Sequence, residues 1–112
     1  MRSYTIVYIT TKDLRQARLI GKTLVCEKLA ACANILDRMH SFYFWDGKLC
    51  DDREAVLLVK TKKALLDRLV KRVKELHTYA IPCIAAFPIV GGNSDFLAWV
   101  GKETTGPQKR KK

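Results

Sequence analysis

Near the middle of this 112-residue chain, the sequence reads Phe42-Tyr43-Phe44-Trp45-Asp46-Gly47-Lys48. Asp-Gly is typical of two-residue β-hairpin turns, because both turn positions need a positive φ. The aromatic run before it favours a strand. With Asp46 and Gly47 as the turn, Trp45 lies opposite Lys48 and Tyr43 lies opposite Cys50. The sequence therefore predicts a hairpin at the centre of the chain.

The segment before the hairpin predicts a strand, a helix and a second strand. Residues 4–9 are rich in aromatic and β-branched side chains, which favour strands. Thr10 and Asp13 have capping-box spacing, and the helix that follows has an apolar stripe of Ala17, Ile20, Gly21, Leu24 and Val25. The small apolar run 29–35 predicts the next strand, and residues 36–41 are either a loop or a bent continuation of it.

The segment after the hairpin begins with the returning strand, predicted over residues 55–60. Its run Val56-Leu57-Leu58-Val59 favours burial on both faces, as in a central strand. Thr61 is expected to cap a second helix, whose apolar stripe consists of Leu66, Leu69, Val70, Val73 and Leu76.

The last segment predicts a fourth strand and a short helix. Pro82 disfavours helical backbone at the residue before it, which ends the second helical region. Pro88 lacks a backbone N–H, so the strand predicted over residues 83–90 belongs at a sheet edge. Ser94 is expected to cap the final helix.

The predicted element order is β-α-β-β-α-β-α. This order describes an α+β, ferredoxin-like split β-α-β sandwich with an extra C-terminal helix. Right-handed crossovers place the first two helices on one face of the sheet. Apolar side chains on the other face would indicate self-association. We expect a single domain over residues 1–104, followed by a basic flexible tail over residues 105–112.

The composition is typical of a globular protein, with 48% hydrophobic and 29% charged residues. No apolar run approaches the roughly 20 residues of a membrane helix, and the N-terminus lacks a signal-peptide pattern. We therefore expect a cytoplasmic protein without a membrane partner. Lys and Arg total 21 against 11 Asp and Glu, and the resulting charge of +10 attracts polyanions. A basic nucleic-acid-binding module is thus one alternative, but nucleic acid is not the expected partner because no RNA-binding signature accompanies the charge.

No motif predicts an enzyme. The sequence has no Gly-x-x-x-x-Gly-Lys phosphate loop, and Gly91-Gly92 is typical of a turn. No local signature brings a cysteine and a histidine together as nucleophile and base. We therefore expect a non-enzymatic protein.

Side chains able to bind a metal are scattered along the chain. No Cys-x-x-Cys pair occurs among the four cysteines, Cys26, Cys32, Cys50 and Cys83. Continued along the hairpin, the register places Cys32 opposite Thr61, which excludes a Cys32–Cys50 bridge and leaves other pairings open. Further capable ligands, none at a diagnostic spacing, are His40, Asp51, Asp52, Glu54 and His77. A complete site would therefore need several chains at an oligomer interface.

Five segments in order resemble signatures of the CutA divalent-ion tolerance family, over about residues 4–104. They are Glu27-Lys28-Leu29-Ala30-Ala31-Cys32-Ala33-Asn34, Ser41-Phe42-Tyr43-Phe44-Trp45-Asp46-Gly47-Lys48, Glu54 with Lys60-Thr61, His77-x-Tyr79-x-x-Pro82 and Phe96-Leu97-x-Trp99. The resemblance implies a cytoplasmic homotrimer similar to PII signalling proteins, joined through edge strands and the long hairpin. It also implies a role in tolerance of divalent ions, with copper or another divalent cation as ligand.

This chain departs from the copper ligands proposed for some bacterial members of that family. Ile9 stands where those members have a cysteine, and its side chain cannot bind a metal. Leu76-His77 replaces two successive histidines, and Cys83 follows the proline where a glutamate is frequent. His77 and Cys83 are therefore the candidate metal ligands.

The resemblance also implies a cleft between subunits. The positions expected in or near it, beside His77, are Tyr43, Trp45, Glu54, Lys60, Tyr79 and Trp99. Glu54 and Lys60 could form an ion pair across the interface. The first hypothesis is that the protein is a non-enzymatic homotrimer, acts in divalent metal ion tolerance or response, and binds metal at these clefts. The alternatives are a PII-like signalling or scaffold trimer that binds a small anionic ligand there, and the basic nucleic-acid-binding module.

Overall fold

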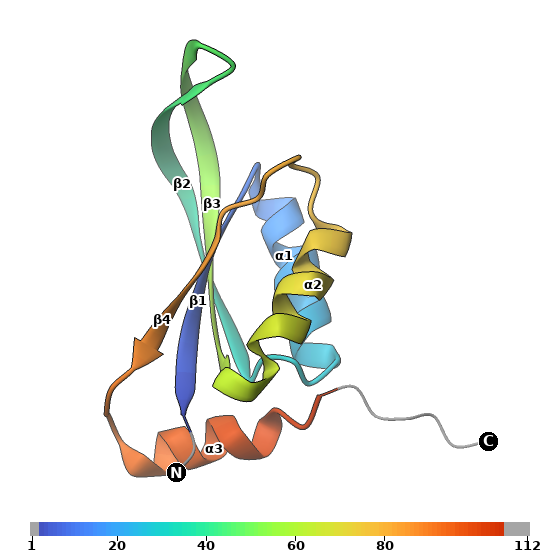
Figure 1. Cartoon of the computed structure of the whole chain (residues 1–112), viewed down its shortest axis with the longest axis vertical. Helices are drawn as coiled ribbons and strands as arrows, with labels where there is room; N and C mark the ends of the chain where they lie inside the picture. Colours follow the sequence, from blue (N-terminus) through green and yellow to red (C-terminus); the bar gives the residue numbers. More distant parts are fainter. Residues whose placement is uncertain (1–2, 107–112) are drawn as a thin grey trace, which may run out of the picture.

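The computed structural model describes residues 3–106 and arranges them as a sheet with helices against one side (Figure 1). The elements are β1 (Tyr4–Thr11), α1 (Leu14–Cys26), β2 (Cys32–Trp45), β3 (Lys48–Lys62), the 3-10 turn η1 (Lys63–Leu65), α2 (Leu66–Leu76), β4 (Ile84–Ile89) and α3 (Ser94–Glu103). This order confirms the predicted β-α-β-β-α-β-α arrangement. From residue 107 onward, the predicted basic tail lies outside the described residues.

The four strands form one sheet in the order β2-β3-β1-β4, and every neighbouring pair is antiparallel. This is the strand order of a ferredoxin-like sandwich. β4 is an edge strand, as Pro88 predicts. Figure 1 shows α1 and α2 packed along one face of the sheet, and α3 crossing the end farthest from the hairpin tip. The opposite face carries no helix along the strands, so it is called the open face below.

The core lies between the sheet and the two covering helices. Val7 and Ile9 of β1 are fully buried and alternate with half-buried Tyr8, which therefore points to the open face. The helices contribute the predicted stripes, of which Ile20, Leu24, Leu69 and Val73 have no exposed surface. At roughly 1.5–3 kcal/mol for each large buried side chain, this layer dominates the stability of the fold.

The hairpin confirms the predicted turn but corrects its register near the base. Pairing runs as expected from Trp45 opposite Lys48 to Met39 opposite Glu54. A bulge between Leu36 and Met39 then shifts the register by one residue, so Cys32 lies opposite Lys60 and not Thr61. Residues 36–41 are thus the bent continuation of the strand. β3 starts at Lys48, seven residues before the predicted start, because the aromatic and acidic residues of the turn region pair as strand.

Three predicted helix caps are wrong. The Thr61 hydroxyl donates to the backbone oxygen of Leu29 at 2.7 Å while β3 continues to Lys62, so the second helical segment starts later, at η1. Asp13 alone is the N-cap of α1, accepting from the backbone N–H of Gln16 at 2.8 Å. Asn93, one residue before Ser94, caps α3 with a 2.9 Å bond from the N–H of Asp95.

Candidate functional site

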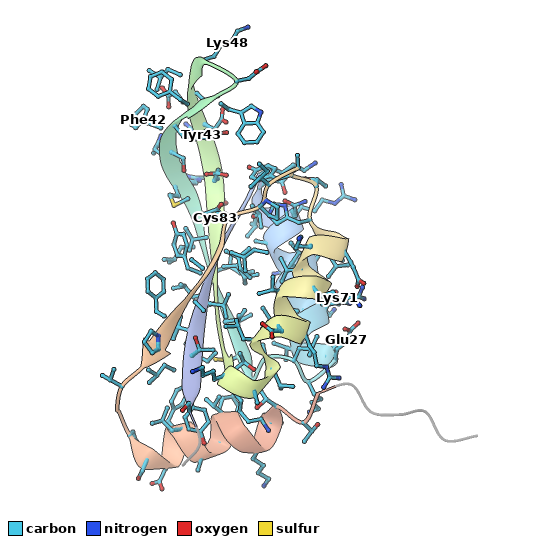
Figure 2. The ribbon with its side chains drawn as sticks, in the orientation of Figure 1. Glu27, Phe42, Tyr43, Lys48, Lys71 and Cys83 are labelled. Carbon is cyan, nitrogen blue, oxygen red and sulfur yellow. The ribbon has the colours of Figure 1, made fainter. Side chains whose placement is uncertain are left out.

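A cavity of about 850 Å³ opens at the base of the hairpin, on the open face. Its walls come from the end of β1 at Tyr8 and Thr10, from the hairpin strands, and from the loop that leads into β4. Bulging of β2 and the twist of the long hairpin bring these three segments around one space. Figure 2 shows Cys83 just before β4, below Tyr43 on the hairpin.

The buried carboxylate of Glu54 forms the polar centre of this cavity. Glu54 is only 7% exposed, and its Oε2 accepts a 2.7 Å hydrogen bond from the hydroxyl of Tyr79. Burial and this hydrogen bond to Glu54 raise the pKa of Tyr79 above the ordinary value of 10. Tyr79 therefore remains a neutral hydrogen-bond donor at physiological pH, and the pair fixes the loop against the hairpin.

His77 fixes the same loop through hydrogen bonds at both of its ring nitrogens. Its Nδ1 accepts a 3.1 Å hydrogen bond from the backbone N–H of Tyr79, so this nitrogen carries the lone pair. Its Nε2 then carries the proton and donates to the backbone oxygen of Thr10 at 2.7 Å. The His77 and Tyr79 rings lie with centroids 4.8 Å apart. Both nitrogens of His77 are thus engaged within the chain.

Two sulfur-containing side chains line the cavity, Met39 and Cys83. The hydroxyl of Tyr8 donates to Sδ of Met39 at 3.5 Å. Burial, with smaller electrostatic contributions from Cys83 and Glu54, raises the pKa of Tyr8 above its ordinary value of 10. Cys83 is exposed, and all four cysteines are free, so its thiol is available to a ligand.

The structure brings together most of the predicted site residues. Tyr43, Trp45, Glu54, Tyr79 and Cys83 line the cavity, and His77, which does not line it, accepts a hydrogen bond from the backbone N–H of Tyr79. The hydroxyl of Tyr43 donates to Asp52 at 2.5 Å, which raises the pKa of Tyr43 to about 12.

Two predicted residues lie elsewhere. Lys60 is six residues from Glu54 along β3, a distance of about 20 Å, and it donates to the side chain of Asn34. Trp99 packs against Phe96 on α3, with ring centroids 5.9 Å apart. Within one chain, Glu54 pairs with Tyr79, so an ion pair between Glu54 and Lys60 across subunits stays a prediction.

Sequence reasoning missed Tyr8 and Met39. Tyr8 could have been found, because alternation in a strand with buried Val7 and Ile9 places it on the open face. Met39 could not, because its position depends on a bulge that no local sequence signal marks.

No group of three or more histidine, cysteine, aspartate or glutamate side chains within residues 3–106 could enclose a metal ion. Glu54, His40 and Cys83 supply oxygen, nitrogen and sulfur donors to one cavity, but these side chains are not grouped closely enough to hold a metal ion. Over the same residues, no helix is long and apolar enough to span a membrane.

Comparison with known proteins gives consistent matches. Residues 5–103 match the family model of the CutA1 divalent ion tolerance protein. The divalent-cation tolerance protein CutA of Thermus thermophilus is 46% identical over 101 residues, covering 90% of this chain and 97% of the relative. The rice protein CutA 1, chloroplastic, is 39% identical over 99 residues, covering 88% of this chain; the chain spans only 56% of that relative.

A solved structure agrees with these sequence matches. The divalent cation tolerance protein Cut A1 from Thermus thermophilus superimposes with a TM-score of 0.88 at 44% identity, covering 90% of this chain and 98% of the other. The family-model match over residues 5–103 takes in every element described above except the first residue of β1. The chain therefore belongs to the CutA1 divalent ion tolerance protein family.

Proposed function

We propose that this chain is a non-enzymatic homotrimer that acts in divalent metal ion tolerance and binds copper or another divalent cation in clefts between its subunits. The observation that carries the proposal is the cavity at the hairpin base. A buried carboxylate and two sulfur atoms border it, and its lining includes no lysine or arginine. Such a space attracts cations and offers copper the soft ligands it prefers.

Cys83 and His77 enter this proposal differently. The Cys83 side chain is exposed at the cavity wall and could bind a cation without rearrangement. The lone pair of His77 is on Nδ1, which accepts from the N–H of Tyr79. A cation could use this nitrogen only after that hydrogen bond opens. We therefore expect Cys83 to contribute more to cation affinity than His77 does.

Exposed apolar surface supports the trimer. On the hairpin arm, defined as residues 41–52, Phe42, Phe44 and Leu49 are 70%, 74% and 62% exposed. Figure 1 shows this arm projecting beyond the sheet, and Figure 2 shows Phe42 on it. At the two edges of the open face, Leu36 and Phe87 are also exposed. Large apolar side chains exposed in this way mark an interface, and a three-fold rotation would cover them together with the sheet edges.

We also propose a cytoplasmic location, in which free thiols are the norm. All four cysteines, each within the described residues, are free. The alternative of a trimer that binds a small anion at the same clefts is less well supported, because the cavity lining carries a carboxylate and no basic side chain other than His40.

Light scattering and equilibrium dialysis test this proposal on one sample. We expect a mass of three times 12.8 kDa, and retention of Cu²⁺ or Zn²⁺ in integer stoichiometry per trimer after dialysis. Mg²⁺ serves as the control, since it prefers all-oxygen sites and should not be retained. A monomer, or retention no greater than that of Mg²⁺, would contradict the proposal.

A further inference from the structure

A second hollow, separate from the cavity at the hairpin base, lies between α1 and the edge strand β2. Its volume is about 690 Å³, which is within the range of small-ligand sites. We propose that this groove, called the α1–β2 groove below, binds a small organic phosphate that carries two or three linked phosphate groups.

The close approach of helix and strand shapes the groove. A Cβ added to Gly21 would lie 3.2 Å from Cβ of Ala33 and 3.0 Å from Cδ1 of Leu57, so α1 packs here with almost no space to spare. Figure 1 shows α1 lying alongside the lower part of β2. The longer side chains on either side of this contact form the walls of a shallow trough.

One wall is a row of cations. Arg15, Arg18 and Lys22 line the groove at i, i+3 and i+7, a spacing that places all three on the same face of α1. All three are exposed, and none takes part in an ion pair within residues 3–106. The lining contains no aspartate or glutamate, so nothing neutralises this wall. An anion is therefore the ligand that the electrostatics favour.

The length of the row selects the kind of anion. Seven residues of helix separate Arg15 from Lys22, which corresponds to about 10 Å along the axis. Two or three linked phosphate groups can extend along this row and contact all three cations, whereas a single phosphate would require the long side chains at both ends to converge on it. Two of the cations are arginines, whose planar guanidinium groups form paired hydrogen bonds with phosphate oxygens.

A second, apolar wall, formed by β2 with the loop before it and by two side chains of α1, points to an organic part on the ligand. It consists of Ala31, Ala33 and Ile35 together with Leu19 and Val25 of α1, and Leu19 is 54% exposed although it lies between Arg18 and Lys22 in the helix. A flat aromatic or aliphatic group placed against this wall would bury apolar surface while the phosphates contact the cations. This combination of surfaces fits a nucleoside di- or triphosphate better than an inorganic one.

The helix α1 and the hairpin differ in charge, since α1 carries three basic residues and no acidic one. Residues 37–54 contain five of the 11 acidic residues and only three of the 21 basic ones. The hairpin that bears the cation-attracting cavity is therefore acidic on balance, and the excess positive charge lies on the rest of the molecule. The two cavities thus have opposite electrostatic preferences.

Calorimetric titration of the full-length protein with adenosine 5′-triphosphate tests the inference, with chelator present to remove metals. We expect saturable binding of one molecule per chain. Replacing two groove cations, Arg18→Gln with Lys22→Gln, should weaken binding by at least about tenfold, because charge-assisted hydrogen bonds are lost. The matched control, Lys71→Gln with Lys74→Gln, removes the same charge from exposed positions of α2 and should change affinity by no more than about twofold.

Four outcomes would overturn the inference. They are no saturable binding, equal weakening by the α2 control, equal affinity for inorganic triphosphate, and tighter binding of a single-stranded oligonucleotide than of the nucleotide. Equal weakening by the control would mean diffuse attraction to net charge. A negative result leaves the cation proposal intact, because that proposal concerns a different cavity and is measured with metals.

Discussion

The hydroxyl of Tyr79 donates a 2.7 Å hydrogen bond to Oε2 of Glu54, a carboxylate that is only 7% exposed. The two residues are 25 positions apart, on the loop before β4 and on β3. A buried carboxylate without a donor is strongly disfavoured, so this bond holds the loop against the hairpin and gives the cavity its shape.

Removing this donor should destabilise the protein. Tyr79→Phe leaves the Glu54 carboxylate buried without its hydroxyl partner, and we expect the free energy of unfolding to fall by about 1–3 kcal/mol. Urea denaturation at one fixed protein concentration measures the change. Tyr43→Phe is the matched control, because it also removes a tyrosine–carboxylate bond, but at an exposed position. If the control variant lost as much stability as Tyr79→Phe, burial of Glu54 would not be the cause.

Tyr79 should ionise at a higher pH than a tyrosine in the unfolded chain. Burial and Glu54 raise the pKa of Tyr79 above 10, whereas in the unfolded chain it ionises near 10. At pH values between the unfolded-state pKa and the higher native-state pKa of Tyr79, the native state binds more protons than the unfolded state. The free energy of unfolding therefore falls as pH rises above 10. Tyr79→Phe should lose stability less steeply than the wild type in that window, measured as the melting temperature against pH. Equal slopes for the two proteins would contradict the raised pKa.

Tyr43 allows a direct spectroscopic check. Its hydrogen bond to Asp52 raises the pKa of Tyr43 to about 12. In an absorbance titration of phenolate, the signal missing from Tyr43→Phe relative to the wild type should therefore be centred near pH 12. A missing signal centred near pH 10 would mean that the bond to Asp52 does not persist in solution.

The exposed side chains of the hairpin arm should control assembly. Phe44→Ser with Leu49→Ser removes two large apolar side chains that contact little in the single chain. We expect the scattering mass to shift from trimer toward monomer while the far-ultraviolet circular dichroism stays unchanged. Lys48→Ser, at the hairpin tip in Figure 2, is the control and should leave the mass unchanged. A trimer that survived both apolar replacements would exclude the arm as the main interface.

Gly21 should tolerate no large side chain. A Cβ there already lies 3.0 Å from Leu57 and 3.2 Å from Ala33, so Gly21→Val forces α1 away from β2. We expect a loss of about 2 kcal/mol, typical of overpacking, in urea denaturation. Gly91→Val is the control, since nothing lies within 4 Å of a Cβ at that position, and it should be nearly neutral. Comparable losses in the two variants would mean that crowding at the α1–β2 contact is not responsible.

The sequence contained enough information for the fold because its signals are local and periodic. Asp46-Gly47 fixed the hairpin turn and the pairing near it, and the stripes on α1 and α2 identified the buried faces. The predictions of Thr61 and Ser94 as helix caps are wrong because several adjacent residues can cap a helix, and tertiary contacts decide which one does. Thr61 instead bonds to Leu29, far away in the chain.

The site was harder to predict, for a related reason. Family resemblance supplied Glu54, Tyr79 and Cys83, which the structure brings to one cavity. It could not supply Met39, whose place depends on the bulge after Leu36, nor the engagement of both nitrogens of His77. Lys60 and Trp99 lie outside the cavity in the single chain. Lys60 is too far along β3 from Glu54, and Trp99 is on α3, at the end of the sheet farthest from the hairpin tip.

Calorimetric titration with Cu²⁺ and Zn²⁺ of reduced, tag-free protein tests the proposed function most directly. Wild type is compared with Cys83→Ser and with Cys26→Ser, which removes another exposed thiol outside the cavity. We expect saturable binding with integer stoichiometry per trimer, weakened in Cys83→Ser and unchanged in Cys26→Ser. No binding by the wild type, or equal binding by all three proteins, would contradict a cation site in this cavity.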